Sequence, residues 1–96
     1  MDAPLETVTV NGKRVGIYSI SNTERKELVS LEVEMIKTNN PVPFLVKFVF
    51  FAIRKGEPDL TEETLWKVDF FSGPGKLLLA EVRRVLGTDF RSEVKQ

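Results

Sequence analysis

Cysteine and histidine are both absent from this 96-residue sequence. Without cysteine the chain has no disulfide framework, no thiol nucleophile and no zinc-thiolate site. Without histidine it lacks the commonest general base and the commonest metal ligand. These absences argue against enzymes and metalloproteins, and we expect no catalytic residue, no metal site and no cofactor.

An excess of charge of either sign is also lacking, because 14 Lys and Arg residues balance 14 Asp and Glu residues. A nucleic-acid-binding protein usually carries a basic excess that neutralises phosphates, so we expect no nucleic-acid partner. The apolar fraction of 42% is ordinary for a folded protein. The length suits one domain with a modest core, which we place at 1–96, with 1–5 and 88–96 loosely ordered.

No hydrophobic run is long enough to span a bilayer. The apolar stretch Val42–Ile53 is too short and contains Lys47. The N-terminal residues "MDAPLETVTV" lack the positive charge and following apolar run of a signal peptide. We therefore expect no membrane partner and a cytoplasmic location.

The stretch "TVTVNGKRVGIYSI" predicts a β-hairpin, because two alternating, β-branched runs flank Asn11-Gly12. That dipeptide tolerates the positive φ angles of a type I′ turn. A lone two-stranded hairpin is marginally stable in water. This hairpin must therefore pack on the elements that follow or on another copy of itself.

A helix is predicted from Ser21 to Asn40, because Ser21 and Glu24 have the spacing of a capping box and Asn39-Asn40-Pro41 ends the pattern. Its apolar side chains cover an arc of roughly 200°, which is wide for a helix lying on one surface. We expect contacts on two sides, one of them a candidate subunit interface. The apolar side chains are Leu28, Val29, Leu31, Val33, Met35 and Ile36.

The run "PVPFLVKFVFFAIRKG" is compatible with a buried strand or a helix. A preceding proline, basic residues at its end and Gly56 at the C′ position favour a helix. Only Lys47 and Arg54, seven residues apart, interrupt its apolar surface. We expect a central helix wrapped by the others, with Phe44, Phe48, Val49, Phe51 and Ala52 buried.

A further helix is predicted over "EPDLTEETLWKVDFF", with Asp59 or Thr61 as its cap. On such a helix Leu65, Val68 and Phe71 form one apolar stripe, and Trp66 and Phe70 form another. One stripe is expected to face the core and the other a partner. We predict partner binding through Trp66, Phe70 and the tail residue Phe90, with Val29 and Val33 as further candidates. The alternative is that the hairpin covers the Trp66 and Phe70 stripe.

The segment "KLLLAEVRRVLG" predicts a last helix with Leu78, Leu79, Val82, Val85 and Leu86 on its inner face. The fold class is therefore α+β, an N-terminal β-hairpin followed by a bundle of three to four α-helices. The preceding "GPGK" lacks the first glycine and the final hydroxyl of a phosphate-binding loop, so we interpret it as a turn with a helix-initiating proline. The acids of "EPD" and "TEE" and the pair Arg83-Arg84 lie where helix dipoles favour their charges.

The segment Phe50–Leu65, "FFAIRKGEPDLTEETL", resembles the tail assembly chaperones of long-tailed bacteriophages. Those proteins often show an apolar helix with a basic end, followed by "P-D-L-T" and acidic residues that open the next helix. The "V-N-G-K" hairpin at Val10–Lys13 also fits their frequent β start. The small size, the balanced charge and the lack of catalytic residues agree with the family as well.

The resemblance implies a non-enzymatic protein of the host cytoplasm. Such chaperones bind the aggregation-prone tape-measure protein and help tail-tube subunits polymerise around it. The expected partners are thus the tape-measure protein, the tail-tube protein and further copies of this chain. Two alternatives stay open: a small homo-oligomeric structural or connector protein, and another kind of protein-binding module.

Overall fold

The N-terminal hairpin forms as predicted. In a computed structural model that describes residues 3–87, strands β1 (Glu6–Val10) and β2 (Lys13–Ile17) pair antiparallel with Val8 opposite Val15. Asn11 and Gly12 join them at φ angles of 54° and 81°, the positive pair that a type I′ turn requires. The face that carries Val8, Val10, Val15 and Ile17 is buried.

Helix α1 (Asn22–Thr38) begins at the predicted capping box. The Ser21 N–H donates to Glu24 Oε1 at 2.8 Å, and the Glu24 N–H donates to Ser21 Oγ at 3.2 Å. The helix ends at Asn39, whose φ of 57° is the left-handed conformation that closes many helices. Both ends of α1 were therefore predictable from local chemistry.

The ambiguous apolar run is a helix, α2 (Val42–Ile53), followed by a short 3₁₀ helix, η1 (Arg54–Gly56). Eight of its twelve residues are buried, and they include all five that the sequence predicts to be buried. The predicted C′ position of Gly56 is wrong, because α2 ends at Ile53 and Gly56 lies in η1, without the positive φ that is usual at C′. A Cβ at Gly56 would lie 2.9 Å from the Tyr18 hydroxyl, so the glycine allows this close approach.

Helices α3 (Glu62–Trp66) and α4 (Gly73–Leu86) complete the fold. Thr61, rather than Asp59, caps α3 by accepting from the Thr64 N–H. The predicted continuation of this helix to Phe71 is wrong. The Asp69 carboxylate accepts from the Phe71 N–H at 2.8 Å and from the Ser72 hydroxyl at 2.6 Å, which stabilises a turn instead. Helix α4 then starts within Gly73-Pro74-Gly75.

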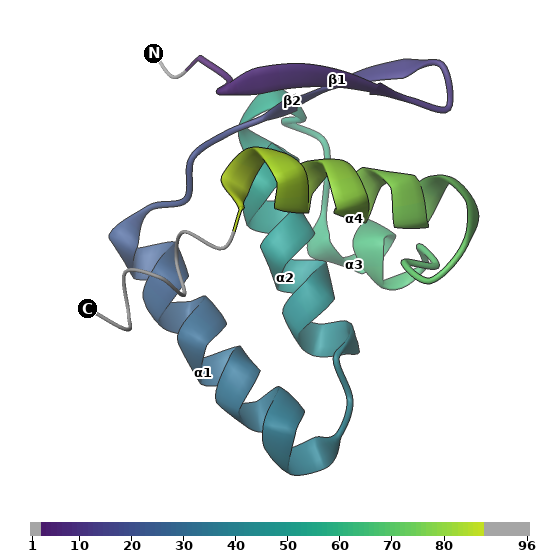
Figure 1. The fold of residues 1–96 in the computed structure, drawn as a ribbon. Helices are drawn as coiled ribbons and strands as arrows, with labels where there is room; N and C mark the ends of the chain where they lie inside the picture. The colour runs from purple at the N-terminus through teal and green to yellow at the C-terminus, as the bar shows by residue number, and fades with distance from the viewer. Residues whose placement is uncertain (1–2, 88–96) are drawn as a thin grey trace.

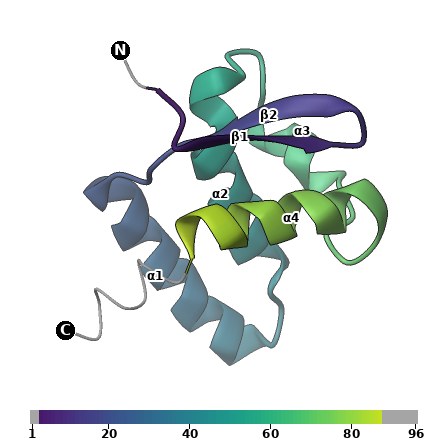
Figure 2. The same ribbon diagram turned by 45° about the horizontal axis from the view of Figure 1, so that its top comes forward.

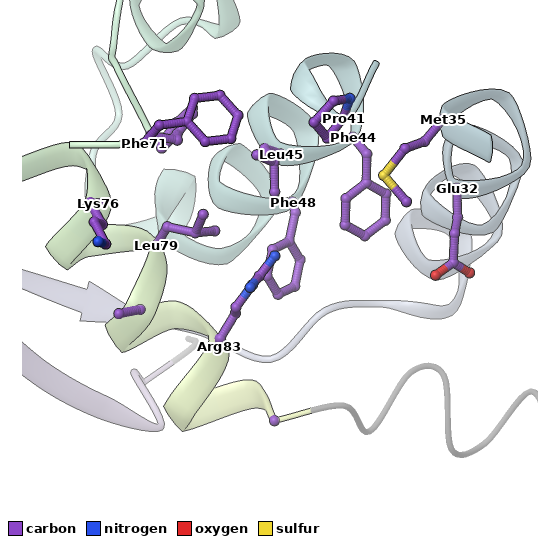
Figure 3. Close-up of a pocket in the computed structure, with 13 residues that line it drawn as sticks. Glu32, Met35, Pro41, Phe44, Leu45, Phe48, Phe71, Lys76, Leu79 and Arg83 are labelled. Carbon is purple, nitrogen blue, oxygen red and sulfur yellow. The ribbon is translucent and has the colours of Figure 1, made fainter. Parts of the chain in front are cut away.

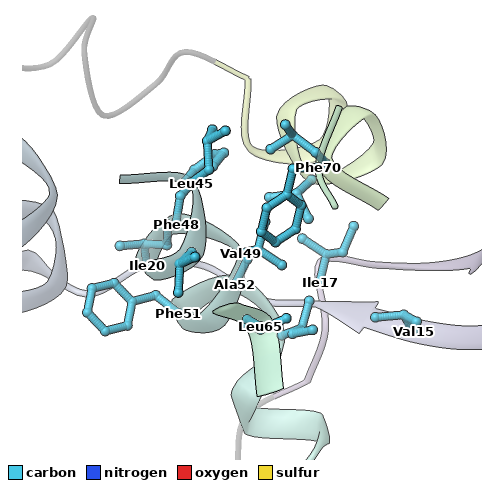
Figure 4. Close-up of a cluster of buried hydrophobic side chains, with 14 of the residues drawn as sticks. Val15, Ile17, Ile20, Leu45, Phe48, Val49, Phe51, Ala52, Leu65 and Phe70 are labelled. Carbon is cyan, nitrogen blue, oxygen red and sulfur yellow. The ribbon is translucent and has the colours of Figure 1, made fainter. Parts of the chain in front are cut away.

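Helix α2 lies at the centre of the fold, with α1 along one side and α4 crossing it, and the hairpin covers one end (Figures 1 and 2). The Tyr18 N–H donates to the Ala52 carbonyl oxygen at 2.7 Å and thereby fixes β2 to the end of α2. Side chains from the hairpin, all four α-helices and the turn before α4 form one core, part of which Figure 4 shows. The predicted α+β class, a hairpin followed by helices, is confirmed.

Candidate functional site

Helices α1 and α4 both pack on α2, and an apolar hollow of about 860 Å³ lies between them (Figure 3). We call this hollow the α1–α4 groove. Its floor is α2, one side is α1, and the other side is α4 with the turn that precedes it. The lining residues are Glu32, Met35, Pro41, Phe44, Leu45, Phe48, Phe70, Phe71, Lys76, Leu79, Ala80, Arg83 and Gly87.

The floor of the groove is aromatic because α2 carries apolar residues on almost its whole surface. Phe44 and Phe48 are four residues apart, so they lie on the same face of the helix. Their rings stack with centroids 5.7 Å apart and planes 21° apart. Leu45 lies beside them, and the three side chains make an apolar base for whatever the groove contacts.

The two sides of the groove carry opposite charges. Glu32 lies on the α1 side next to Met35, whereas Lys76 and Arg83 lie on the α4 side (Figure 3). Lys76 and Arg83 are seven residues apart, which places them two turns apart along the same side of α4. The groove therefore suits an apolar segment whose polar flanks carry a base toward α1 and an acid toward α4.

Ion pairs fix α1 and α3 against α2. Glu24, only 5% exposed, pairs with Arg54, whose guanidinium lies 4.9 Å from the Phe51 ring centroid. Lys47 pairs with Glu62 at 2.8 Å and with Glu27 at 3.0 Å. The pKa of Lys47 is raised above its ordinary value, mainly by the hydrogen bond to Glu62. Burial opposes this effect, and the hydrogen bond to Glu27 raises the pKa further. Lys47 of α2 and Arg54 of η1 thus position α1, the helix that forms one side of the groove.

Helix α4 is held by the hairpin and by the turn before it. Arg84 pairs with Glu6 of β1 and with Glu81 one turn away. The hydrogen bond from Arg84 lowers the pKa of Glu6 and raises that of Arg84 itself. At Gly75 the backbone of α4 lies so close to the turn that an added Cβ would sit 2.8 Å from the Asp69 carbonyl carbon. The groove's second side is therefore closely packed at its start.

The predicted partner-binding residues end up in different environments. Trp66 is 48% exposed, but Phe70 is 3% exposed and belongs to the core, so the proposed stripe of these two residues does not exist. The reason is that α3 ends at Trp66 and the chain turns before Phe70. Phe71, assigned to the other stripe, is 60% exposed and lines the groove. Phe90 lies outside the described residues.

Helix α1 is less buried than its wide apolar arc implied. Leu28 is its only fully buried apolar residue, and Val29 is partly buried. Val33 is 48% exposed and Ile36 is 75% exposed. Met35 is partly buried and lines the groove. One side of α1 packs on α2, as expected, whereas the predicted contact on a second side, the candidate subunit interface, stays a prediction.

Sequence reasoning missed the groove itself and the roles of Phe71, Ala80 and Met35 in it. The turn-forming pair Asp69 and Ser72 was the signal that α3 stops early and that Phe70 and Phe71 point in different directions. The groove depends on the crossing of α4 over α2, a long-range packing arrangement that no local pattern encodes.

Within residues 3–87, no cluster of three or more acidic side chains is arranged to hold a metal ion. Over the same range, no helix has the length and apolar character needed to cross a bilayer. Comparison with protein-family models, with curated proteins and with solved structures finds no match to this chain. The function must therefore be argued from the groove and its surroundings.

Proposed function

We propose that this protein is a non-enzymatic assembly chaperone that holds an amphipathic helix of a partner protein in the α1–α4 groove. The observation that carries the proposal is the groove itself, an open apolar hollow of about 860 Å³ with an aromatic floor. Exposed apolar concavities rimmed by polar residues are typical of protein-binding sites. The groove needs no catalytic group, which agrees with the absence of cysteine and histidine.

The size of the groove suits a helix. A helical turn is a cylinder about 10 Å wide and about 5.4 Å long, so it occupies roughly 400 Å³. The groove volume of about 860 Å³ thus corresponds to about two turns. Two turns present apolar side chains at positions i, i+3, i+4 and i+7, the usual anchors of a helix bound in a groove.

Around the groove, exposed apolar side chains can extend the contact. Phe71 forms part of its edge and is 60% exposed. Burying a phenylalanine of this exposure stabilises a complex by roughly 1–2 kcal/mol. The charged residues Glu32, Lys76 and Arg83 at the sides orient a bound helix rather than supply most of its affinity. A chaperone benefits from this balance, because it has to release its partner.

The partner we propose is the tape-measure protein of a long-tailed bacteriophage, with the tail-tube protein as a second contact and the host cytoplasm as the location. This part of the proposal rests on the resemblance of Phe50–Leu65 to tail assembly chaperones. The same segment includes the end of α2 and all but the last residue of α3, so it belongs to the scaffold behind the groove rather than to the groove.

The test is whether the protein keeps a tape-measure fragment soluble, and whether this depends on the groove. Ala80→Arg places a long side chain in the groove from an exposed position of α4. Leu77→Arg introduces the same residue on the same helix at a position that is 58% exposed and does not line the groove. We expect Ala80→Arg to lose the soluble complex and Leu77→Arg to keep it. Equal behaviour of the two variants would refute groove binding.

A second candidate function is that of a homo-oligomeric structural subunit. It is favoured by Val33 and Ile36, which are exposed on α1 and do not line the groove. A second copy of the chain could cover them in a symmetric contact of two α1 helices. Sedimentation of the wild type and of Ile36→Lys distinguishes the two functions. A stable oligomer that Ile36→Lys dissociates, with no binding of the fragment, would favour the structural subunit.

A further inference from the structure

The chain leaves α4 at the α1–α4 groove. Gly87, the last described residue, lines the groove and follows the end of the helix at a φ of 63° and a ψ of −145°. This conformation of Gly87 ends the helical path of α4. Nine further residues, "TDFRSEVKQ" at 88–96, are attached at this point. The tail is therefore attached to the chain at a residue that lines the groove.

We propose that the tail Thr88–Gln96 binds in the α1–α4 groove of its own chain and that a partner helix must displace it. The tail's aromatic residue, Phe90, is three residues beyond Gly87. Three extended residues span about 10 Å, a distance that reaches across a groove sized for a helix about 10 Å wide. Phe90 would then lie on the floor formed by Phe44 and Phe48. The second half of this proposal, displacement by a partner, rests on the proposed function.

The charges of the tail match the two sides of the groove. Asp89 precedes Phe90 and Arg91 follows it. With Phe90 on the floor, Arg91 can reach the Glu32 side of the groove while Asp89, nearer to Gly87, stays close to Arg83 on the α4 side. The tail thus meets the requirement that the groove sets for its occupant, a base toward α1 and an acid toward α4.

The strength of this contact follows from its covalent attachment. With one aromatic anchor the detached tail is a weak ligand, and we take its Kd as about 1 mM. A short flexible connection holds the attached segment at an effective concentration in the millimolar range, about 1–10 mM. The tail is therefore bound about half to nine-tenths of the time. Removing its anchor should tighten the binding of a competing helix by about two- to tenfold.

The ε-methyl group of Met35 offers a direct readout, because Met35 lines the groove and the chain has two methionines. In full-length protein labelled with ¹³C at the methionine methyls, Met35→Leu identifies the resonance. We expect Phe90→Ser to shift the Met35 signal through the lost ring, whereas Lys95→Ser, a change elsewhere in the tail, leaves it in place. Each of Arg91→Glu and Glu32→Arg should shift the signal in the same direction, and the double variant should restore it.

The result that overturns the proposal is a Met35 signal that Phe90→Ser leaves unchanged. A shift that depends on protein concentration would also overturn it, because a second copy would then be the occupant. Titration of wild type and of Phe90→Ser with the tape-measure fragment separates this inference from the proposed function. Equal affinities of the two proteins for the fragment, together with an unchanged Met35 signal, refute binding of the tail in the groove and do not affect the proposed function. No binding by either protein, together with a shifted Met35 signal, refutes the function and leaves the tail contact standing.

Discussion

A methyl group added at Gly75 should destabilise the protein, although alanine favours helices. Gly75 is in the first turn of α4 and is buried. Its backbone is in such close contact with the turn before α4 that a Cβ would lie 2.8 Å from both the Asp69 carbonyl carbon and Val68 Cγ1. The carbonyl oxygen of Asp69 would be closer still. Backbone atoms cannot rotate away, so Gly75→Ala must push α4 away from this turn.

The size of the effect follows from two opposing contributions. Replacing glycine by alanine in an unobstructed helix interior stabilises a protein by up to about 1 kcal/mol. Overpacking in a closely packed region costs about 1–3 kcal/mol, and a clash with backbone belongs at the upper end. The expected net destabilisation is therefore about 2 kcal/mol. For a chain of this size that lowers the melting temperature by roughly 8–16 °C.

Thermal unfolding followed by circular dichroism measures this change directly. The matched control is Ala80→Gly, the reverse substitution at an exposed position of the same helix, which should cost about 1 kcal/mol from helix propensity alone. A Gly75→Ala variant that melts at or above the wild-type temperature would refute the close packing of α4 on the turn. The groove's α4 side would then be placed differently from the arrangement described above.

Two further predictions concern the capping box and the turn. Glu24→Ala removes the side chain that accepts from the Ser21 N–H and pairs with Arg54. We expect the free energy of unfolding to fall by about 1–2 kcal/mol, mostly from the lost cap because Arg54 stays partly solvated. An unchanged midpoint of urea unfolding would contradict this. The hydrogen bond from Ser72, followed by that from the Phe71 N–H, lowers the pKa of Asp69 below its ordinary 3.8. A lowered pKa in the folded state means that the carboxylate stabilises the fold above pH 3.8 and loses this effect as the pH falls through the lowered value. The difference in melting temperature between wild type and Asp69→Ala should therefore shrink in acid, and a difference that stays constant would argue against the turn.

Elements defined by local chemistry were predictable from the sequence. The Asn11-Gly12 turn determines where the hairpin reverses, and the reciprocal hydrogen bonds of Ser21 and Glu24 determine where α1 begins. The ambiguous apolar run is a helix, as the proline before it and its single polar stripe indicated, whereas the signal from Gly56 was wrong. Lys47 and Arg54 on that stripe each find acidic partners on neighbouring helices.

For the candidate site, the presence of surplus apolar residues was predictable, but their arrangement was not. The sequence indicated surplus apolar surface near Trp66, Phe70 and α1. It did not indicate which of these residues share a surface, because the side-chain bonds of Asp69 outweigh the helical pattern that Trp66 and Phe70 suggest. The crossing of α4 over α2 then decides that Phe71, rather than Trp66, lines the groove.

The absence of cysteine makes the groove directly testable, because one introduced cysteine can be labelled alone. Ala80→Cys places an environment-sensitive fluorophore in the α1–α4 groove, and Leu77→Cys places the same probe on α4 outside it. Both are titrated with the tape-measure fragment while quenching by iodide is recorded. If the groove binds the partner helix, the probe at position 80 becomes protected from iodide and the probe at position 77 does not. If the fragment binds and both probes remain equally accessible, the groove is not the binding site.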